Sequence, residues 1–226
     1  MNRTFAIFFL AGIIFTSCTT APPTIKAEQF TVQYTSATVP WLANLYNCSG
    51  MNVIPAEQRA ADFLDLKSAS MVIRLGSPGN INGFPYQIGT DDLLVVVASK
   101  NPTRTLNAEQ TRELFTGQIR NWKTIDGNDA SVQVWVFSNG EDIQELFDET
   151  VLEGSPVSSG AYLAANLDEM VRSVGKDISA IGIITGRWKT GNLTSVYKAA
   201  SNLPVLAISL SKPQGTLAGI LACMQR

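Results

Sequence analysis

The run from Leu93 to Ala98 (LLVVVA) constrains the fold of this chain more than any other segment. An unbroken aliphatic run is typical of a strand buried on both faces, as in parallel or mixed sheets covered by helices. Further strand patterns lie at 30–34, 52–54, 71–75, 132–137, 180–185 and 204–209. Helical apolar spacing lies between them, at 39–47, 56–67, 107–115, 139–151, 163–174 and 215–224. This alternation predicts an α/β fold.

Composition excludes several classes of protein. Of the 226 residues, 45% are hydrophobic and 16% are charged, which argues against disorder. The net charge is −2 and no basic block occurs, so we expect no nucleic-acid partner. The chain has no histidine, which removes His-based catalysts and metal sites, and its three cysteines are too few for a Cys-only zinc site. No Gly-x-Ser-x-Gly motif occurs either, so we expect no enzyme, cofactor or metal.

The first residues have the form of a secretory signal peptide. Arg3 precedes an apolar run from Phe5 to Phe15, which is too short to span a membrane. The segment 15–18 (FTSC) resembles a bacterial lipobox, which implies cleavage after residue 17 and a lipid on Cys18. The alternative is an ordinary signal peptide with an incidental cysteine. We expect residues 18–29, with two adjacent prolines, to form a tether, and the protein to be exported and lipid-anchored on the periplasmic or extracellular face of a bacterial membrane.

Two further cysteines, Cys48 and Cys223, lie far apart in the chain. An exported protein reaches a compartment in which disulfides persist, so we predict that these two are bridged. The alternative is a pair of buried free thiols, because cysteine is commonly buried.

The middle of the chain carries a specific resemblance. The segment 106–110 (LNAEQ) leads to 114–122 (LFTGQIRNW), which is similar to a signature of the phosphate-binding lipoproteins of bacterial ABC transporters. The stretches 132–147, 169–171 and 180–182 continue the similarity. Within this signature we expect Phe115 and Trp122 to be core residues, not ligand contacts.

The resemblance implies a type II periplasmic-binding-protein fold with two lobes and a ligand cleft between them. Lobe one would comprise residues 30–98 and 190–226, and lobe two residues 99–189, which places both Cys48 and Cys223 in lobe one. It also implies a monomeric solute-binding protein with a small-molecule or anion ligand and an ABC permease as partner.

Phosphate-binding relatives hold their anion at three places, two of which lie in lobe one. The first corresponds to Thr35, Ser36 and Ala37, which follow a strand and offer hydroxyl and N–H donors. The alternative is a plain helix N-cap. The second corresponds to Arg74 at the end of the strand 71–75, where the family has small polar residues. Arg74 would bind a carboxylate or phosphate; the alternative is a surface arginine or an ion pair between the lobes.

The third place lies in lobe two, over Ser138, Asn139, Gly140, Glu141 and Asp142. The family's arginine falls on Phe137 and its Ser-Gly-Thr on 141–143, so two carboxylates replace anion donors. We therefore predict that the protein does not bind phosphate in the manner of the family. Two functions stay open: a receptor for another small ligand, in which the carboxylates would hold an amine and Arg74 a carboxylate, or a ligand-less or sensory envelope module that binds a protein partner.

Overall fold

The computed structural model describes residues 29–226 except 51, 65–68, 78 and 80–82. The expected signal peptide, the tether up to residue 28 and Cys18 lie outside the described residues. The described strands form one sheet in the order β2-β1-β3-β8-β4-β7-β5-β6. Their bounds are β1 Phe30–Tyr34, β2 Val53–Glu57, β3 Met71–Leu75, β4 Phe84–Ala98, β5 Gln133–Phe137, β6 Tyr162–Ala164, β7 Ala180–Thr185 and β8 Leu193–Ser209.

Helices cover this sheet at both ends of the molecule. The α-helices are α1 Leu42–Ser49, α2 Ala108–Thr116, α3 Asp142–Phe147, α4 Leu167–Lys176 and α5 Gly215–Met224. Shorter helical turns are η1 Ser36–Trp41, η2 Ala60–Leu64, η4 Trp122–Ile125, η5 Asp148–Leu152 and η6 Gly186–Trp188. The predicted α/β fold is therefore confirmed, with a mixed sheet flanked by helices.

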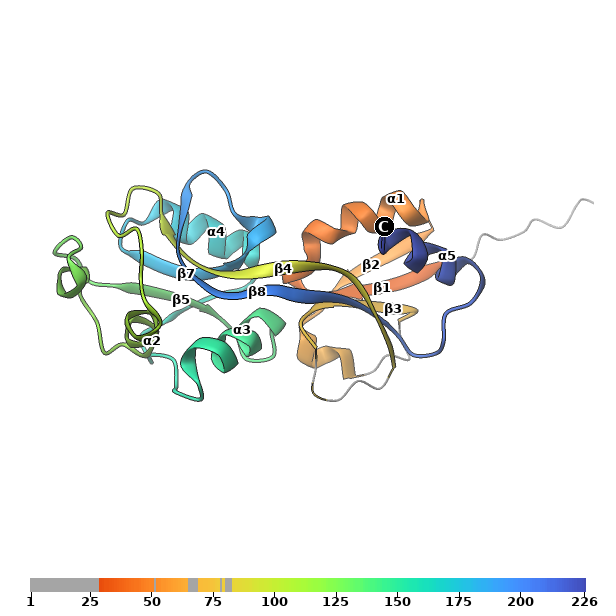
Figure 1. The fold of residues 1–226 in the computed structure, drawn as a ribbon, viewed down its shortest axis with the longest axis horizontal. Helices are drawn as coiled ribbons and strands as arrows, with labels where there is room; N and C mark the ends of the chain where they lie inside the picture. Colours follow the sequence, from red (N-terminus) through yellow and green to blue (C-terminus); the bar gives the residue numbers. More distant parts are fainter. Residues whose placement is uncertain (1–28, 51, 65–68, 78, 80–82) are drawn as a thin grey trace, which may run out of the picture.

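Two groups of elements lie at opposite ends of the long axis (Figure 1). Lobe one holds β1, β2, β3, α1 and α5, and lobe two holds β5, β6, β7 and α2 to α4. The long antiparallel strands β4 and β8 run side by side through both groups. The exact boundaries at residues 98 and 190 stay a prediction, because β4 and β8 each continue from one lobe into the other.

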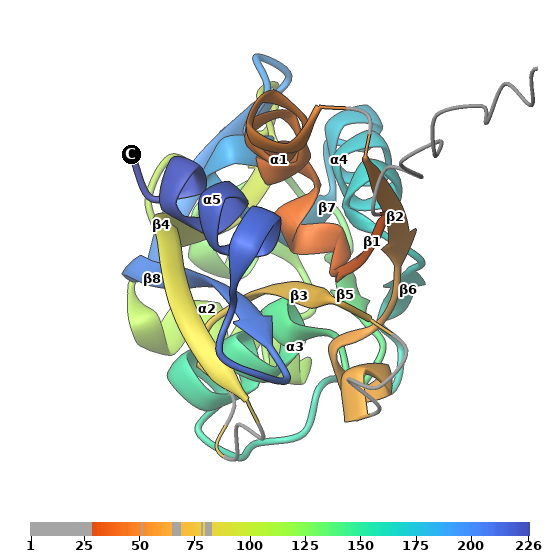
Figure 2. The ribbon, with the colours of Figure 1, turned by 90° about the vertical axis from the view of Figure 1, so that its right-hand side faces the viewer.

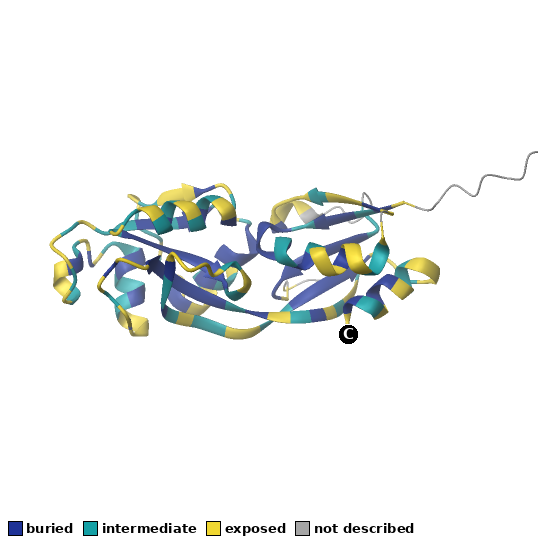
Figure 3. Cartoon of the chain, turned by 90° about the horizontal axis from the view of Figure 1, so that it is seen from above, coloured by how far each residue is buried: buried dark blue, intermediate teal, exposed yellow. Residues whose placement is uncertain are grey.

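The position of β4 explains the aliphatic run. Between Leu93 and Val97, β4 pairs with β7 on one side and with β8 on the other. Val95, Val96 and Val97 are fully buried, as expected for a central strand covered on both faces. Figure 3 shows such buried strand residues in both lobes, with exposed residues on the outer helices.

The core of lobe two is built on the signature segment. Phe115 and Trp122 are buried, as predicted, and the ring of Phe115 packs against Phe147 with centroids 4.5 Å apart. The helix α2 starts at a capping box, in which Asn107 and Gln110 satisfy each other's backbone N–H groups. Through the packing of Phe115 on Phe147, the signature segment acts as a scaffold for α3.

In lobe one, a disulfide joins Cys48 and Cys223, the pair that the sequence predicted, with their Cα atoms 5.7 Å apart. It links α1 to α5, which lie beside each other in Figure 2. The disulfide therefore connects the first helix of the described chain with the last one.

Some expected elements differ from the structure. The helix predicted over 56–67 is wrong at its start, because residues Val53–Glu57 form the edge strand β2, parallel to β1. Pro55 lacks an N–H donor and is tolerated at a sheet edge, so it marks this strand and not a helix N-terminus. Only the short turn η2 follows, and residues 65–68 lie outside the description. The helix expected from 163 begins at Leu167, after the cap Asn166, and the one expected over 139–151 is divided into α3 and η5.

Candidate functional site at the interface of the lobes

A buried carboxylate stands where the two lobes meet. Asp142 is the first residue of α3 in lobe two and is fully buried. Its Oδ2 accepts hydrogen bonds from the Thr35 hydroxyl at 2.7 Å and from the Leu75 backbone N–H at 2.7 Å, both in lobe one. Its Oδ1 accepts from the N–H of Ile143 at 2.8 Å. One side chain thus connects α3 with β3 and with the residue that precedes η1.

The surroundings of Asp142 act on its pKa in opposite directions. Burial is the largest effect and raises the pKa of Asp142 above its ordinary value, while the hydrogen bonds from Thr35 and Leu75 and the positive charge of Arg74 oppose this rise. All three hydrogen bonds at the carboxylate are donated to it, which is the arrangement that suits an ionised acid.

Arg74 bridges the lobes as an ion pair. Its residue is only 7% exposed, and its Nη2 lies 3.2 Å from Oε2 of Glu145 on α3. Its Nε donates to the carbonyl of Leu75 at 3.3 Å. The alternative of an ion pair between the lobes therefore describes this arginine, and part of its charge is already balanced.

The segment that follows β1 also contacts lobe two. The Ser36 hydroxyl accepts a hydrogen bond from the N–H of Leu167, the first residue of α4, at 2.9 Å. Thr35 occupies the N-cap position of η1 but makes no side-chain cap, so a plain N-cap does not account for it. Ala37 is buried in the core. Thr35 and Ser36 thus act as contacts between the lobes.

Gly140 and Glu141 extend this interface toward η2. The carbonyl of Gly140 accepts from the N–H of Ala61 at 2.9 Å, and a Cβ at this glycine, whose φ is +92°, would lie 2.7 Å from that of Ala61. Glu141 is buried, and its pKa rises to about 7, first through burial and then through the negative charges of Asp142 and Glu57. This carboxyl is therefore poised to change charge near neutral pH.

The structure brings together only part of the predicted set. Thr35, Arg74 and Asp142 meet around one carboxylate, and Ser36 and Gly140 make their own contacts across the interface. Two residues do not join them: Ser138 and Asn139 line a separate hollow beside β5, together with Leu163.

Three residues outside the predicted set also form contacts between the lobes: Leu75, Leu167 and Glu145. Leu75 and Leu167 take part through backbone N–H groups, which leave no side-chain signal. Glu145 lies one helical turn beyond Glu141, so its spacing along α3 was the available sign.

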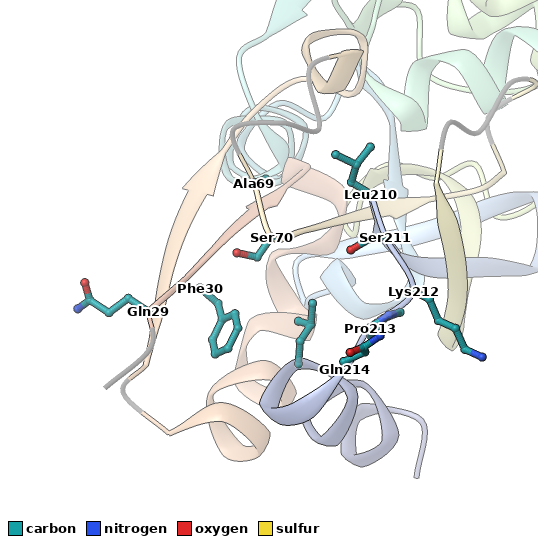
Figure 4. A pocket seen from close by; sticks show the side chains of 10 residues that line it. Gln29, Phe30, Ala69, Ser70, Leu210, Ser211, Lys212, Pro213 and Gln214 are labelled. Atoms are coloured by element: carbon teal, nitrogen blue, oxygen red, sulfur yellow. The ribbon is translucent and has the colours of Figure 1, made fainter. Parts of the chain in front are cut away.

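A small cavity of about 160 Å³ remains between the lobes. It is lined by Tyr34, Ser36, Val39 and Glu57 from lobe one, by Asn166, Leu167 and Asp168 at the start of α4, and by Trp188. A larger cavity of about 650 Å³ lies near Gln29 and the start of α5, with Phe30, Ser70 and Lys212 among its lining residues (Figure 4). That cavity contains none of the predicted site residues.

The described part of the chain carries neither a membrane-spanning helix nor a cluster of metal ligands. No helix there is long and apolar enough to cross a membrane, and no group of three or more potential metal ligands occurs in it. Ser-x-x-Lys spacing, a feature of some serine catalysts, does occur, for example at Ser195–Lys198 and Ser209–Lys212. However, Lys198 pairs with Asp92, and the Ser209 hydroxyl donates to the carbonyl of Ser211.

Comparison with known proteins identifies the architecture. A family model described as PBP superfamily domain matches residues 78–221. A putative phosphate ABC transporter substrate-binding protein from Clostridium perfringens, solved with bound phosphate, superposes with a TM-score of 0.77 at 16% identity, covering 87% of this chain and 93% of that one.

Two further solved structures have the same architecture. An ABC-type phosphate transport receptor from Vibrio cholerae gives a TM-score of 0.66 at 18% identity, over 88% of this chain and 94% of that one. A regulatory domain of OxyR2 from Vibrio vulnificus gives 0.62 at 12% identity, over 87% and 96%. The shared fold thus occurs both in substrate-binding proteins and in a regulatory domain.

Proposed function

The chain belongs to the PBP superfamily, and on that premise we propose that it is an exported, lipid-anchored solute-binding-type protein that does not bind phosphate as phosphate-binding relatives do. The main support is the buried carboxylate of Asp142, which accepts the hydrogen bonds of Thr35 and Leu75 at the predicted anion position. We propose no catalytic activity for it.

Electrostatics support the exclusion of phosphate. Two like charges about 5 Å apart repel by roughly 3 kcal/mol at an effective dielectric constant of 20, and a dianion is repelled more. The donors that would offset this repulsion are engaged, because Thr35 and Leu75 bind Asp142 and Arg74 pairs with Glu145. A phosphate ion would therefore have to displace an internal carboxylate that is covalently held in place.

If a solute binds between the lobes, its charge and size are restricted. The cavity of about 160 Å³ is smaller than the ~300–1,000 Å³ of typical ligand sites, and its lining includes the carboxylates of Glu57 and Asp168. A small amine or zwitterion fits these features better than an anion. Delivery to an ABC permease would follow from the family, as for other solute-binding proteins.

A second candidate function is a ligand-less or sensory envelope module that binds a protein partner. The contacts between the lobes favour it, since the five described above all join groups of the chain itself: Thr35 to Asp142, Leu75 to Asp142, Arg74 to Glu145, Ser36 to Leu167 and Ala61 to Gly140. A solute-dependent receptor needs contacts that form only with its ligand. Here the described contacts between the lobes are made by the chain's own groups.

Calorimetric titration of the purified protein with inorganic phosphate tests the exclusion. We expect no binding heat. Phosphate binding at micromolar affinity that is lost in Thr35→Val and Arg74→Met variants, but kept in the exposed control Lys123→Met, would contradict the proposal.

A thermal-shift screen with small amines, zwitterions and other metabolites separates the two candidate functions. A ligand at 100 times its dissociation constant stabilises the folded state by about 2.7 kcal/mol. A reproducible shift supports a solute receptor, and a flat screen supports the partner-binding module.

Labelling of cells with a fatty-acid probe tests the lipid anchor. We expect label on the wild-type protein and none on a Cys18→Ser variant; an unlabelled wild type would show that the cysteine is incidental.

A further inference from the structure

We propose that Asp142 is a built-in ligand: its carboxylate occupies a latent site for small carboxylates and oxyanions in lobe one, and holds the lobes together as a bound anion would. The inference rests on the proposed function, namely that free phosphate is excluded, and gives a physical cause for that exclusion. It goes further by assigning to lobe one an anion site that stays competent when the carboxylate is removed.

The geometry of the donors carries this inference. Thr35 and Leu75 belong to different segments of lobe one, yet the hydroxyl of one and the N–H of the other meet at the same oxygen atom, each at 2.7 Å. Such short distances are typical of hydrogen bonds to a charged acceptor. Convergence of separate segments on one oxygen is the arrangement of an anion site.

Lobe one fixes these donors without help from lobe two. The Thr35 N–H donates to the Ile73 carbonyl at 3.1 Å, and the Thr38 hydroxyl donates to the Thr35 carbonyl at 2.9 Å. Leu75 pairs with Val205 in the ladder between β3 and β8. The donors would therefore keep their positions if Asp142 were replaced.

Charge completes the site. Arg74 is buried in lobe one, while the carboxylate that lowers its electrostatic cost comes from lobe two. Without Asp142, two buried donors would lose their acceptor, and Arg74 would keep the Leu75 carbonyl and the half-exposed carboxylate of Glu145. A small free anion would restore what is lost, and formate or acetate matches the removed group in size and chemistry.

One consequence is that lobe closure becomes independent of solute. In a hinge-type binding protein, closure depends on the concentration of the ligand that bridges the lobes. A carboxylate supplied by the chain is always present, so the closed form persists.

Chemical rescue of an Asp142→Gly variant tests the proposal. We expect its melting temperature to fall below that of the wild type in sodium chloride, and to recover in part when formate or acetate replaces chloride at equal ionic strength. Phosphate in place of chloride tests whether larger oxyanions enter the vacated space. Small-angle scattering should show a larger radius of gyration for the variant in chloride, which decreases in formate.

Two controls make the rescue specific. The wild type, and an Asp142→Asn variant whose amide still fills the site, should respond equally to formate and chloride. No difference between formate and chloride in the Gly variant would overturn the inference. If that variant folds only during refolding in formate, the proposal is supported; if it fails in both salts while Asp142→Asn folds, it is contradicted. Phosphate binding to the wild type would instead contradict the proposed function.

Discussion

The two lobes are joined in two different ways. One is the pair of long strands β4 and β8, which we call the crossover, and the other is the set of contacts around Asp142 and Arg74, which we call the cleft. Along β4 and β8 the connection is a continuous backbone ladder that runs from one lobe into the other. At the cleft it consists of separate polar contacts centred on Asp142 and Arg74. The ladder cannot open without breaking the sheet, whereas each polar group at the cleft can exchange its present partner for a ligand or for water. Substitutions at the crossover should therefore affect folding, and substitutions at the cleft should affect closure.

Side chains support the crossover as well. The indole of Trp41 from η1 lies against Gly89 of β4, and the guanidinium of Arg187 lies 3.9 Å from the centroid of the Trp41 ring. The Arg187 N–H donates to Asp91 of β4 at 3.2 Å. Lobe one thus contacts the crossover through a close aromatic packing that leaves no room beside β4.

The largest effect should come from Gly89→Ala at the crossover. The added methyl group would overlap the Trp41 indole, and overpacking of this kind costs about 2–3 kcal/mol of unfolding free energy. Urea denaturation measures the change. Gly191→Ala is the control, because a Cβ there meets nothing within 4 Å. Equal stability of the two variants would show that the Trp41 packing is adaptable.

Arg74→Met should have the next largest effect, at the cleft. It removes the ion pair with Glu145 and the positive charge near buried Asp142, which we expect to lower the unfolding free energy by about 2 kcal/mol. Lys123→Met, which breaks a well-exposed pair with Asp129, should change it by less than about 1 kcal/mol. A similar loss in both variants would mean that the cleft pair is no stronger than a surface pair.

Glu141→Gln should change the pH dependence of stability. The pKa of Glu141 is about 7 in the folded protein against an ordinary value of 4.5, so the folded state holds its proton more tightly than the unfolded state does. Stability from this group is therefore present below about pH 4.5 and lost as pH rises to about 7.

The glutamine variant, which cannot ionise, should thus be more stable than the wild type at pH 8, by on the order of 1–2 kcal/mol, and nearly equal to it at pH 5. Thermal unfolding at both values measures this, with the exposed Glu149→Gln as control. A gain of the same size at both pH values would exclude ionisation as its cause.

The smallest effect should come from Ser36→Ala at the cleft. It leaves the Leu167 N–H without its acceptor, at a cost of about 1 kcal/mol. Hydrogen exchange at Leu167 should become faster, while exchange within β4 stays unchanged. Faster exchange in β4 as well would show that cleft and crossover open together.

The sequence predicted those parts of the fold that carry a dense apolar pattern. The run 93–98 and the helix after Asn107 are such cases. The first half of β4 and the first half of β8 were missed, because their burial alternates irregularly where the strands pass between the lobes. The strand Val53–Glu57 was predicted only in its first part, as a short strand at 52–54, because pairing with β1, not local propensity, decides the conformation of its second part.

For the candidate site, counting along the family pattern located Asp142 but not its role. The carboxylates at 141 and 142 stand where the family binds its anion, so this segment alone was enough to predict that an anion is repelled. That the carboxylate itself binds Thr35, 107 residues away, depends on how the lobes close. Contacts made through backbone N–H groups, such as that of Leu75, are equally invisible in a residue pattern.

The disulfide between Cys48 and Cys223 makes most of the folded body one covalent ring, since its cysteines lie 175 residues apart. All of lobe two is inserted in this ring. A protease that cuts once in any loop of lobe two therefore releases no fragment, and the nicked protein separates into two pieces only after reduction. In an oxidising compartment, a single cleavage would leave both halves of the cleft attached to each other.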